Sequence, residues 1–267
     1  MLGKLIKYEF KFTAGKYGLM YLVLAAYTLF VIGLGLIHTS NPFVTGTIGF
    51  LTGIYFIVLF GVCVCATGYA VVRFYKTMVS DEGYLTHTLP AKVEHIILSK
   101  FLVAYVFQFL TIILAAASAM LVVSLKFDVN LFSAFHSAIE ELSALGGNVV
   151  SVLIAFLVCA LVSMAYQVLT YYVSIGVGQM LQGNKVVGCV LGYMIINTAV
   201  QVIVAVVSFG VSFIAGVSNG FENLESSISS VSGFTALLAV ETVLMLVLAV
   251  VEYFVTSFCL KKKLNLN

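Results

Sequence analysis

Two carboxylates inside one apolar stretch are the residues of this sequence best suited to chemistry. Glu241 and Glu252 lie eleven residues apart within residues 233–260, and this spacing places both on one face of a helix. If the stretch crosses a membrane, an acid inside it is costly and marks a functional position by default. Such an acid could form a polar contact at a subunit interface, hold a cationic group of a cargo, or carry a proton. Alternatively, Glu252 could extend toward the lysines at 261–263.

Patterns for catalysis or nucleotide binding are not found in the rest of the sequence. The nearest approach to a phosphate-binding loop is residues 178–185, but Asn184 stands where that motif requires lysine. Cys63 and Cys65 have no histidine or acidic neighbour at ligand spacing. An intramembrane hydrolase needs a nucleophile and a base at membrane depth, whereas the four histidines lie near the ends of apolar runs or between them: His38, His87, His95 and His136. The sequence therefore predicts no enzyme, no metal site and no cofactor bound by this chain.

The composition predicts the kind of element that must position these residues. The chain has 267 residues, of which 62% are hydrophobic and 9% charged, and its mean hydropathy is +1.14. Soluble domains carry roughly 25% charged residues, so a soluble enzyme, a nucleic-acid-binding protein and a disordered chain are excluded. The apolar residues come in long runs rather than in alternation, which excludes an outer-membrane barrel. We therefore expect an all-α polytopic membrane protein.

Six apolar runs reach the roughly 20 residues that a helix needs to cross the hydrocarbon core of a bilayer. We expect one transmembrane domain over residues 1–267, with spans at 17–37, 44–72, 101–125, 149–181, 186–215 and 233–260. Two glycine pairs within the runs, Gly49 with Gly53 and Gly188 with Gly192, have the spacing that lets helices approach closely. Packing within the bundle is the expected role of these pairs.

The basic residues orient the six spans. With six crossings, all 13 Lys and Arg residues except Lys126 fall on one side of the membrane. Five acidic residues of the predicted loops lie on the side of Lys126: Asp128, Glu140, Glu141, Glu222 and Glu225. Because lysine and arginine accumulate in cytoplasmic loops, both termini are predicted to be cytoplasmic, in a multi-pass protein of the cell membrane.

Residues 1–16 are predicted to form an amphipathic helix in the headgroup plane before the first span begins. Its basic face carries Lys4, Lys7 and Lys11, and Phe10 lies on the opposite, apolar face. Glu9 falls within the apolar sector, so we expect its carboxylate to have a partner or to reach water. The alternative is a positively charged flank that only sets the topology.

The predicted cytoplasmic loop at 73–100 contains signals for a short helix. Ser80 or Asp81 can cap its start and Pro90 can stop it. Acidic residues would lie in its first turn, and an apolar edge would be formed by Tyr84, Leu85 and Leu89. A short helix of this kind suits insertion into a groove of another protein. The alternative is an ordinary connection between two spans.

Two regions of the sequence, the opening and residues 81–100, resemble a known family of membrane proteins. The opening MLGKLIKYEFK, the segment DEGYL at 81–85, and the short segments TLP at 88–90 and LSK at 98–100 resemble ABC-2-type (type V exporter) permeases of Firmicutes. This resemblance implies a dimer of six-span subunits, either two identical copies or close paralogues. It also implies a coupling helix after the second span, seated in a separate cytoplasmic ATPase that binds ATP and Mg. Residues at matching positions are Asp81, Glu82, Tyr84, Leu85 and Leu89.

The expected function is therefore export, in a Gram-positive bacterium, of a hydrophobic or amphipathic cargo. Within the family, the resemblance is greatest to exporters of antimicrobial or cytolytic peptides, including those of the phenol-soluble-modulin type. Two alternatives from other classes stay open. One is a secondary transporter driven by protons, with Glu241 as the carrier. The other is a membrane scaffold or immunity protein that binds a peptide without transporting it.

Overall fold

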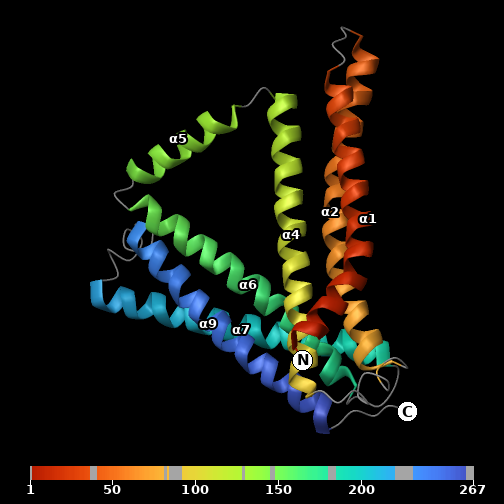
Figure 1. Ribbon diagram of the computed structural model, residues 1–267. Helices are drawn as coiled ribbons and strands as arrows, with labels where there is room; N and C mark the ends of the chain where they lie inside the picture. The colour runs from red at the N-terminus through yellow and green to blue at the C-terminus, as the bar shows by residue number, and fades with distance from the viewer. Residues whose placement is uncertain are drawn as a thin grey trace. The chain divides into compact units, whose positions relative to one another are not determined.

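The computed structural model describes residues 2–36, 41–80, 83, 92–127, 130–144, 148–179, 185–219 and 231–262. Within these ranges the chain forms helices and no strand (Figure 1). The helices are α1 (Leu2–Gly35), α2 (Pro42–Met78), α4 (Val93–Phe127), α5 (Leu131–Ala144), α6 (Val149–Gly178), α7 (Lys185–Asn219) and α9 (Val231–Lys262).

Six of these helices, all except α5, are long and apolar enough to cross a membrane. Large apolar side chains remain exposed along them, for example Phe60 at 69% and Phe209 at 73%. Such surfaces suit lipid rather than water, and a helix satisfies its own backbone hydrogen bonds in lipid. The prediction of an all-α, multi-pass membrane protein is thereby confirmed for the part of the chain that the structure describes.

Helices α1, α2 and α4 form one compact unit, in which the helices run side by side (Figure 1). A buried cluster of Tyr17, Ala66, Val103 and Phe107 joins all three. The Tyr17 ring stacks on Phe107 with centroids 4.7 Å apart, and its hydroxyl donates to the Ala66 carbonyl at 2.8 Å. A single tyrosine therefore bridges three helices, through both its ring and its hydroxyl.

Further tyrosines connect the same helices along their length. The Tyr21 hydroxyl donates to the Phe107 carbonyl at 3.0 Å. Tyr55 belongs to a second buried cluster with Val31 and Val122, and its hydroxyl donates to Ser118 Oγ at 2.9 Å. Each of these three tyrosine hydroxyls has a partner on a neighbouring helix, which offsets the cost of placing it in an apolar interior.

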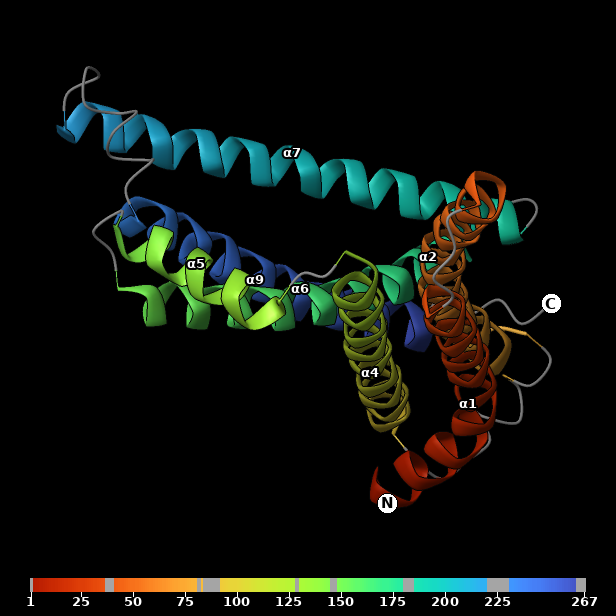
Figure 2. The same cartoon turned by 90° about the horizontal axis from the view of Figure 1, so that it is seen from above.

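Helices α6, α7 and α9 form the second compact unit, in which α9 and α7 both pack against α6. At the C-terminal end of α6, its backbone touches that of the first turns of α7. A Cβ on Gly178 would lie 2.5 Å from the Cys189 nitrogen, and one on Gly188 would lie 2.5 Å from the Gly178 oxygen. Gly192 continues the contact, since its Cβ would lie 3.0 Å from the Ser174 oxygen. From there α7 leans away from α6 toward Asn219 (Figure 2).

The predicted interfacial helix and the predicted first span belong to one continuous helix, α1. Its N-terminal turns bend away from the axis of the rest (Figure 2). Lys4, Lys7 and Lys11 are exposed, while Ile6 packs against the Tyr17 cluster. The placement of residues 1–16 in the headgroup plane stays a prediction.

Helix α5 lies in a segment that the sequence analysis treated as a loop between the third and fourth spans. It is 14 residues long and amphipathic. At helical spacing, Phe135, Ile139 and Leu142 share one face. His136 and Glu140 lie on the other face, 3.2 Å apart. The apolar face is open, because Phe135 is 57% exposed.

Candidate functional site

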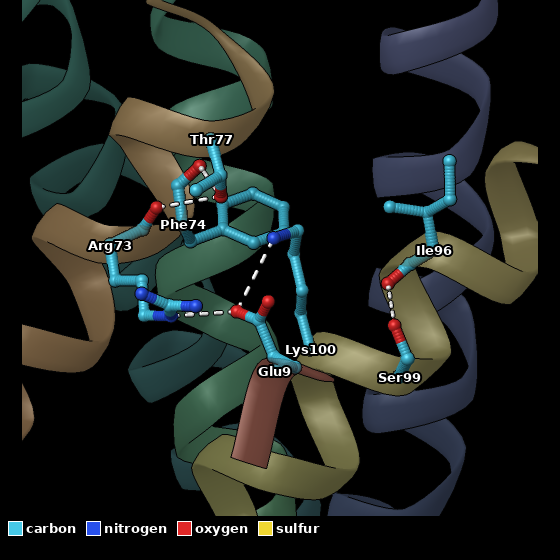
Figure 3. Close-up of polar contacts among 7 residues, drawn as sticks. All are labelled: Glu9, Arg73, Phe74, Thr77, Ile96, Ser99 and Lys100. Carbon is cyan, nitrogen blue, oxygen red and sulfur yellow. Dashed lines mark hydrogen bonds and ion pairs between the residues drawn. The ribbon is translucent and has the colours of Figure 1, made fainter. Parts of the chain in front are cut away.

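Glu9 lies at the centre of an ion-pair cluster in the first unit (Figure 3). Its Oε1 atom accepts from Arg73 Nε at 2.7 Å and from Lys100 Nζ at 3.3 Å. Glu9 comes from α1, Arg73 from α2 and Lys100 from α4. One carboxylate thus joins two cations and all three helices of the unit.

The cluster is largely shielded from solvent. The side chains are 16% exposed for Glu9, 12% for Arg73 and 9% for Lys100. At this burial, the attraction between opposite charges offsets a large cost of removing them from water. Removing Glu9 takes the shared carboxylate from two buried cations, and breaking a buried ion pair costs about 3–5 kcal/mol in comparable cases. The cluster therefore depends most on Glu9, which both cations share.

Aromatic contacts hold the N-terminal turns of α1 beside the ion pairs. The Arg73 guanidinium lies 4.1 Å from the centre of the Phe12 ring, within cation–π range. On the neighbouring helix α4, Phe107 stacks against Phe10 with centroids 4.9 Å apart. Arg73 is the single arginine of the sequence, and its planar group can pair with a carboxylate and stack on a ring together.

The two cations of the cluster lie near the helix ends that flank the predicted coupling helix. Arg73 lies five residues before the last residue of α2, and Lys100 lies seven residues after the first of α4. These are the helices on either side of residues 79–92, which contain the predicted coupling helix at about 81–89. In the same turns, Thr77 donates to the Arg73 carbonyl at 2.7 Å and Ser99 to the Ile96 carbonyl at 2.8 Å (Figure 3).

Glu9 is predicted from its place on an apolar face to have a partner or to reach water, and the structure gives it two partners. Arg73 and Lys100 are not predicted as these partners from the sequence, where their charges only orient the spans. A signal was available: an acid on an apolar face needs a cation, and a lone arginine next to a span end is a good candidate. What the sequence lacks is the distance between them, because these residues lie 64 and 91 positions from Glu9.

The predicted coupling residues Asp81, Glu82, Tyr84, Leu85 and Leu89 lie outside the described residues. Gly83, between them, is described and buried. Its nitrogen donates to the Ser80 carbonyl at 2.6 Å, and a Cβ there would lie 2.8 Å from the Met78 carbonyl carbon and oxygen. This position therefore has no room for a side chain.

The two carboxylates of α9 have different surroundings. Glu252 is buried, with 6% exposure, and both its carboxyl oxygens lie close to Thr170 Oγ1 of α6, at 3.0 and 3.1 Å. Glu241 is only partly buried. Among the described residues, no group of three or more His, Cys, Asp or Glu side chains is arranged to hold a metal ion.

Comparison with models of known protein families, with curated proteins and with solved structures finds no match for this chain.

Proposed function

We propose that this chain is the membrane-spanning permease subunit of an ATP-driven exporter of the ABC-2 type. It would act with a second permease copy and a separate cytoplasmic ATPase. The observation that supports this most is the Glu9 cluster, which links the N-terminal turns of α1 to the helices on both sides of residues 79–92.

A permease driven from its cytoplasmic side needs a stiff connection between its coupling segment and its spans. Arg73 precedes the segment, Lys100 follows it, and Glu9 binds both. A displacement of the ends of the segment is therefore passed to α1, α2 and α4 together, as a movement of packed helices. A loop that only connected two spans would not need a buried ion pair at its base.

The cargo that we propose is hydrophobic or amphipathic, with antimicrobial or cytolytic peptides as the best candidates. The support is the sequence resemblance described above and the supply of apolar and aromatic side chains, including 21 Phe and 14 Tyr. Such side chains suit a path for amphipathic molecules.

The test is affinity purification of the tagged protein from its own membranes in mild detergent, with mass spectrometry of what stays bound. We expect a stoichiometric ATPase subunit that is lost in the double variant Glu82→Ala/Leu85→Ala. The matched control is Glu140→Ala/Leu142→Ala on α5, which changes the same residue types on the side of the membrane predicted to face outward. The control should retain the ATPase.

The other outcomes separate the alternatives. If no ATPase is bound and transport by proteoliposomes depends on a proton gradient, a secondary transporter with Glu241 as carrier takes the place of this proposal. If a peptide binds but is transported neither with ATP nor with a proton gradient, the scaffold or immunity function takes the place of this proposal.

A further inference from the structure

Glu252 lies deep in the apolar part of the second unit. Lys261 near the end of α9 follows it by nine residues, and Gly178 at the end of α6 follows Thr170 by eight. At 1.5 Å per residue, both side chains are about 12–14 Å from these helix ends. The carboxyl is 6% exposed and Thr170 is 3% exposed.

The hydrogen bonds at this contact require one more hydrogen than Thr170 can supply. The Thr170 Oγ1 atom lies 3.0 Å from Glu252 Oε1, 3.1 Å from Oε2, and also 3.0 Å from the Tyr166 carbonyl oxygen. A hydroxyl has one hydrogen to donate. If Glu252 were ionised, that hydrogen would have to serve a carboxylate and a carbonyl together.

No other described group neutralises the Glu252 carboxyl. Glu252 takes part in neither of the ion-pair groups that the structure describes, at Glu9 and at Glu140. Tyr166 on α6 lies near enough to interact electrostatically with Glu252, and Tyr193 on α7 lies near Tyr166. The Tyr166 hydroxyl is buried and has no hydrogen-bond partner. An unpaired carboxylate in such surroundings is strongly disfavoured by desolvation, and a bound proton removes that cost.

We propose that Glu252 and Thr170 form an intramembrane proton-binding site. The carboxyl of Glu252 holds the proton and donates it to Thr170 Oγ1, and the Thr170 hydroxyl donates in turn to the Tyr166 carbonyl. When the proton leaves, the Thr170 hydrogen turns to the carboxylate. The α6–α9 contact thus has two hydrogen-bond arrangements, and the proton selects between them. This inference does not rest on the proposed function, because it requires no ATPase.

The first test is infrared spectroscopy of the purified full-length protein in nanodiscs of zwitterionic lipid at neutral pH. We expect a carbonyl stretching band of a protonated carboxylic acid that is absent in Glu252→Gln and retained in the matched variant Glu241→Gln. Thr170→Val removes the hydrogen-bond acceptor, so the band should remain and shift to higher frequency. A wild-type protein without the band, or a band that survives unchanged in Glu252→Gln, would overturn the proposal.

The second test separates a proton site from a site that needs negative charge. Glutamine can still donate to Thr170, so Glu252→Gln should keep the wild-type unfolding temperature, whereas Glu252→Ala should lower it. If Glu252→Gln lowers the unfolding temperature as much as Glu252→Ala does, the site holds a cation other than a proton and the proposal is wrong. If neither variant folds, the proposal is tested by the carbonyl band of the wild-type protein and by the shift of that band in Thr170→Val.

Discussion

In the unit of α1, α2 and α4, long polar side chains reach from helix to helix, whereas in the unit of α6 and α7 two backbones touch through glycines. Tyr17 spans the first unit with its ring and hydroxyl. Gly178 and Gly188 leave no room for even one carbon atom between the helices of the second. Both arrangements satisfy the same need, since helices in lipid gain little from apolar burial and depend on packing and hydrogen bonds.

The buried carboxyls of the two units also have different partners. Glu9 in the first unit has two cations within 3.3 Å. Glu252 in the second has a threonine hydroxyl. The first arrangement depends on charge, and the second is satisfied by a neutral acid. A change that removes charge should therefore damage the first unit and spare the second, while a change that adds volume should do the reverse.

The largest effect is expected where backbones touch. Gly188→Leu places a side chain against the Gly178 carbonyl, where even a Cβ would lie at 2.5 Å. Overpacking of this kind costs about 3 kcal/mol or more when the surroundings cannot shift, so we expect little folded protein by size-exclusion chromatography. Gly210→Leu on the same helix is the control, because nothing lies within 4 Å of its Cβ position. Equal yields of the two variants would show that α7 does not pack on α6 in this way.

Removal of charge from the first unit should have the next largest effect. Glu9→Gln leaves Arg73 and Lys100 without their carboxylate, and we expect a loss of roughly 3 kcal/mol in the free energy of unfolding. The measurement is denaturation of the purified protein by detergent titration. Lys11→Gln, an exposed charge two residues away, should change the stability by less than about 0.5 kcal/mol.

A double-variant cycle sharpens this prediction. Glu9→Gln combined with Arg73→Gln should cost less than the sum of the two single variants, because the second change removes a cation that the first has left unpaired. Additive losses would mean that the two residues do not form the ion pair.

A single hydroxyl should have a smaller effect. Tyr17→Phe keeps the ring stack on Phe107 but removes the hydrogen bond to the Ala66 carbonyl. Hydrogen bonds between helices in a membrane average about 0.6 kcal/mol and reach about 1.7, so we expect a loss of about 1 kcal/mol. Tyr8→Phe, at a position that is 74% exposed, should leave the midpoint of thermal unfolding unchanged.

The smallest effect is expected for glycines of the first unit that touch nothing. A Cβ at Gly49 or Gly53 would have no atom within 4 Å. Alanine there should be neutral or stabilise the helix by up to about 1 kcal/mol, whereas Gly192→Ala, at 3.0 Å from Ser174, should destabilise the second unit. A marked loss of stability in Gly49→Ala would show that another surface packs on this glycine.

These glycines show what the spacing of residues in a sequence can predict about helix packing. The pairs Gly49–Gly53 and Gly188–Gly192 have the same spacing, yet only the second lies against another helix. Spacing defines a face of a helix, but which element covers that face depends on residues far away in the chain. The same reason separates Glu241 from Glu252, which share a face by period, because Thr170 lies 82 positions from Glu252.

Patterns within one element were more informative. Long apolar runs predicted the six long helices, because length and composition alone decide whether a helix can lie in lipid. Helix α5 could have been predicted by the same kind of reasoning. Its apolar residues recur every three or four positions, but the segment is too short to span a bilayer and carries Glu140 and Glu141, so hydropathy alone predicts a loop there.

The Tyr17 cluster and the Glu9 cluster have a consequence for the order in which this protein is made. The contacts described for the first unit are made among α1, α2 and α4. All three helices lie in the chain up to Phe127. A ribosome delivers these residues before those of α6. During biosynthesis, the described contacts of the first unit can therefore form before α6 enters the membrane. The α6–α9 contact, by contrast, has to wait until α9 is synthesised.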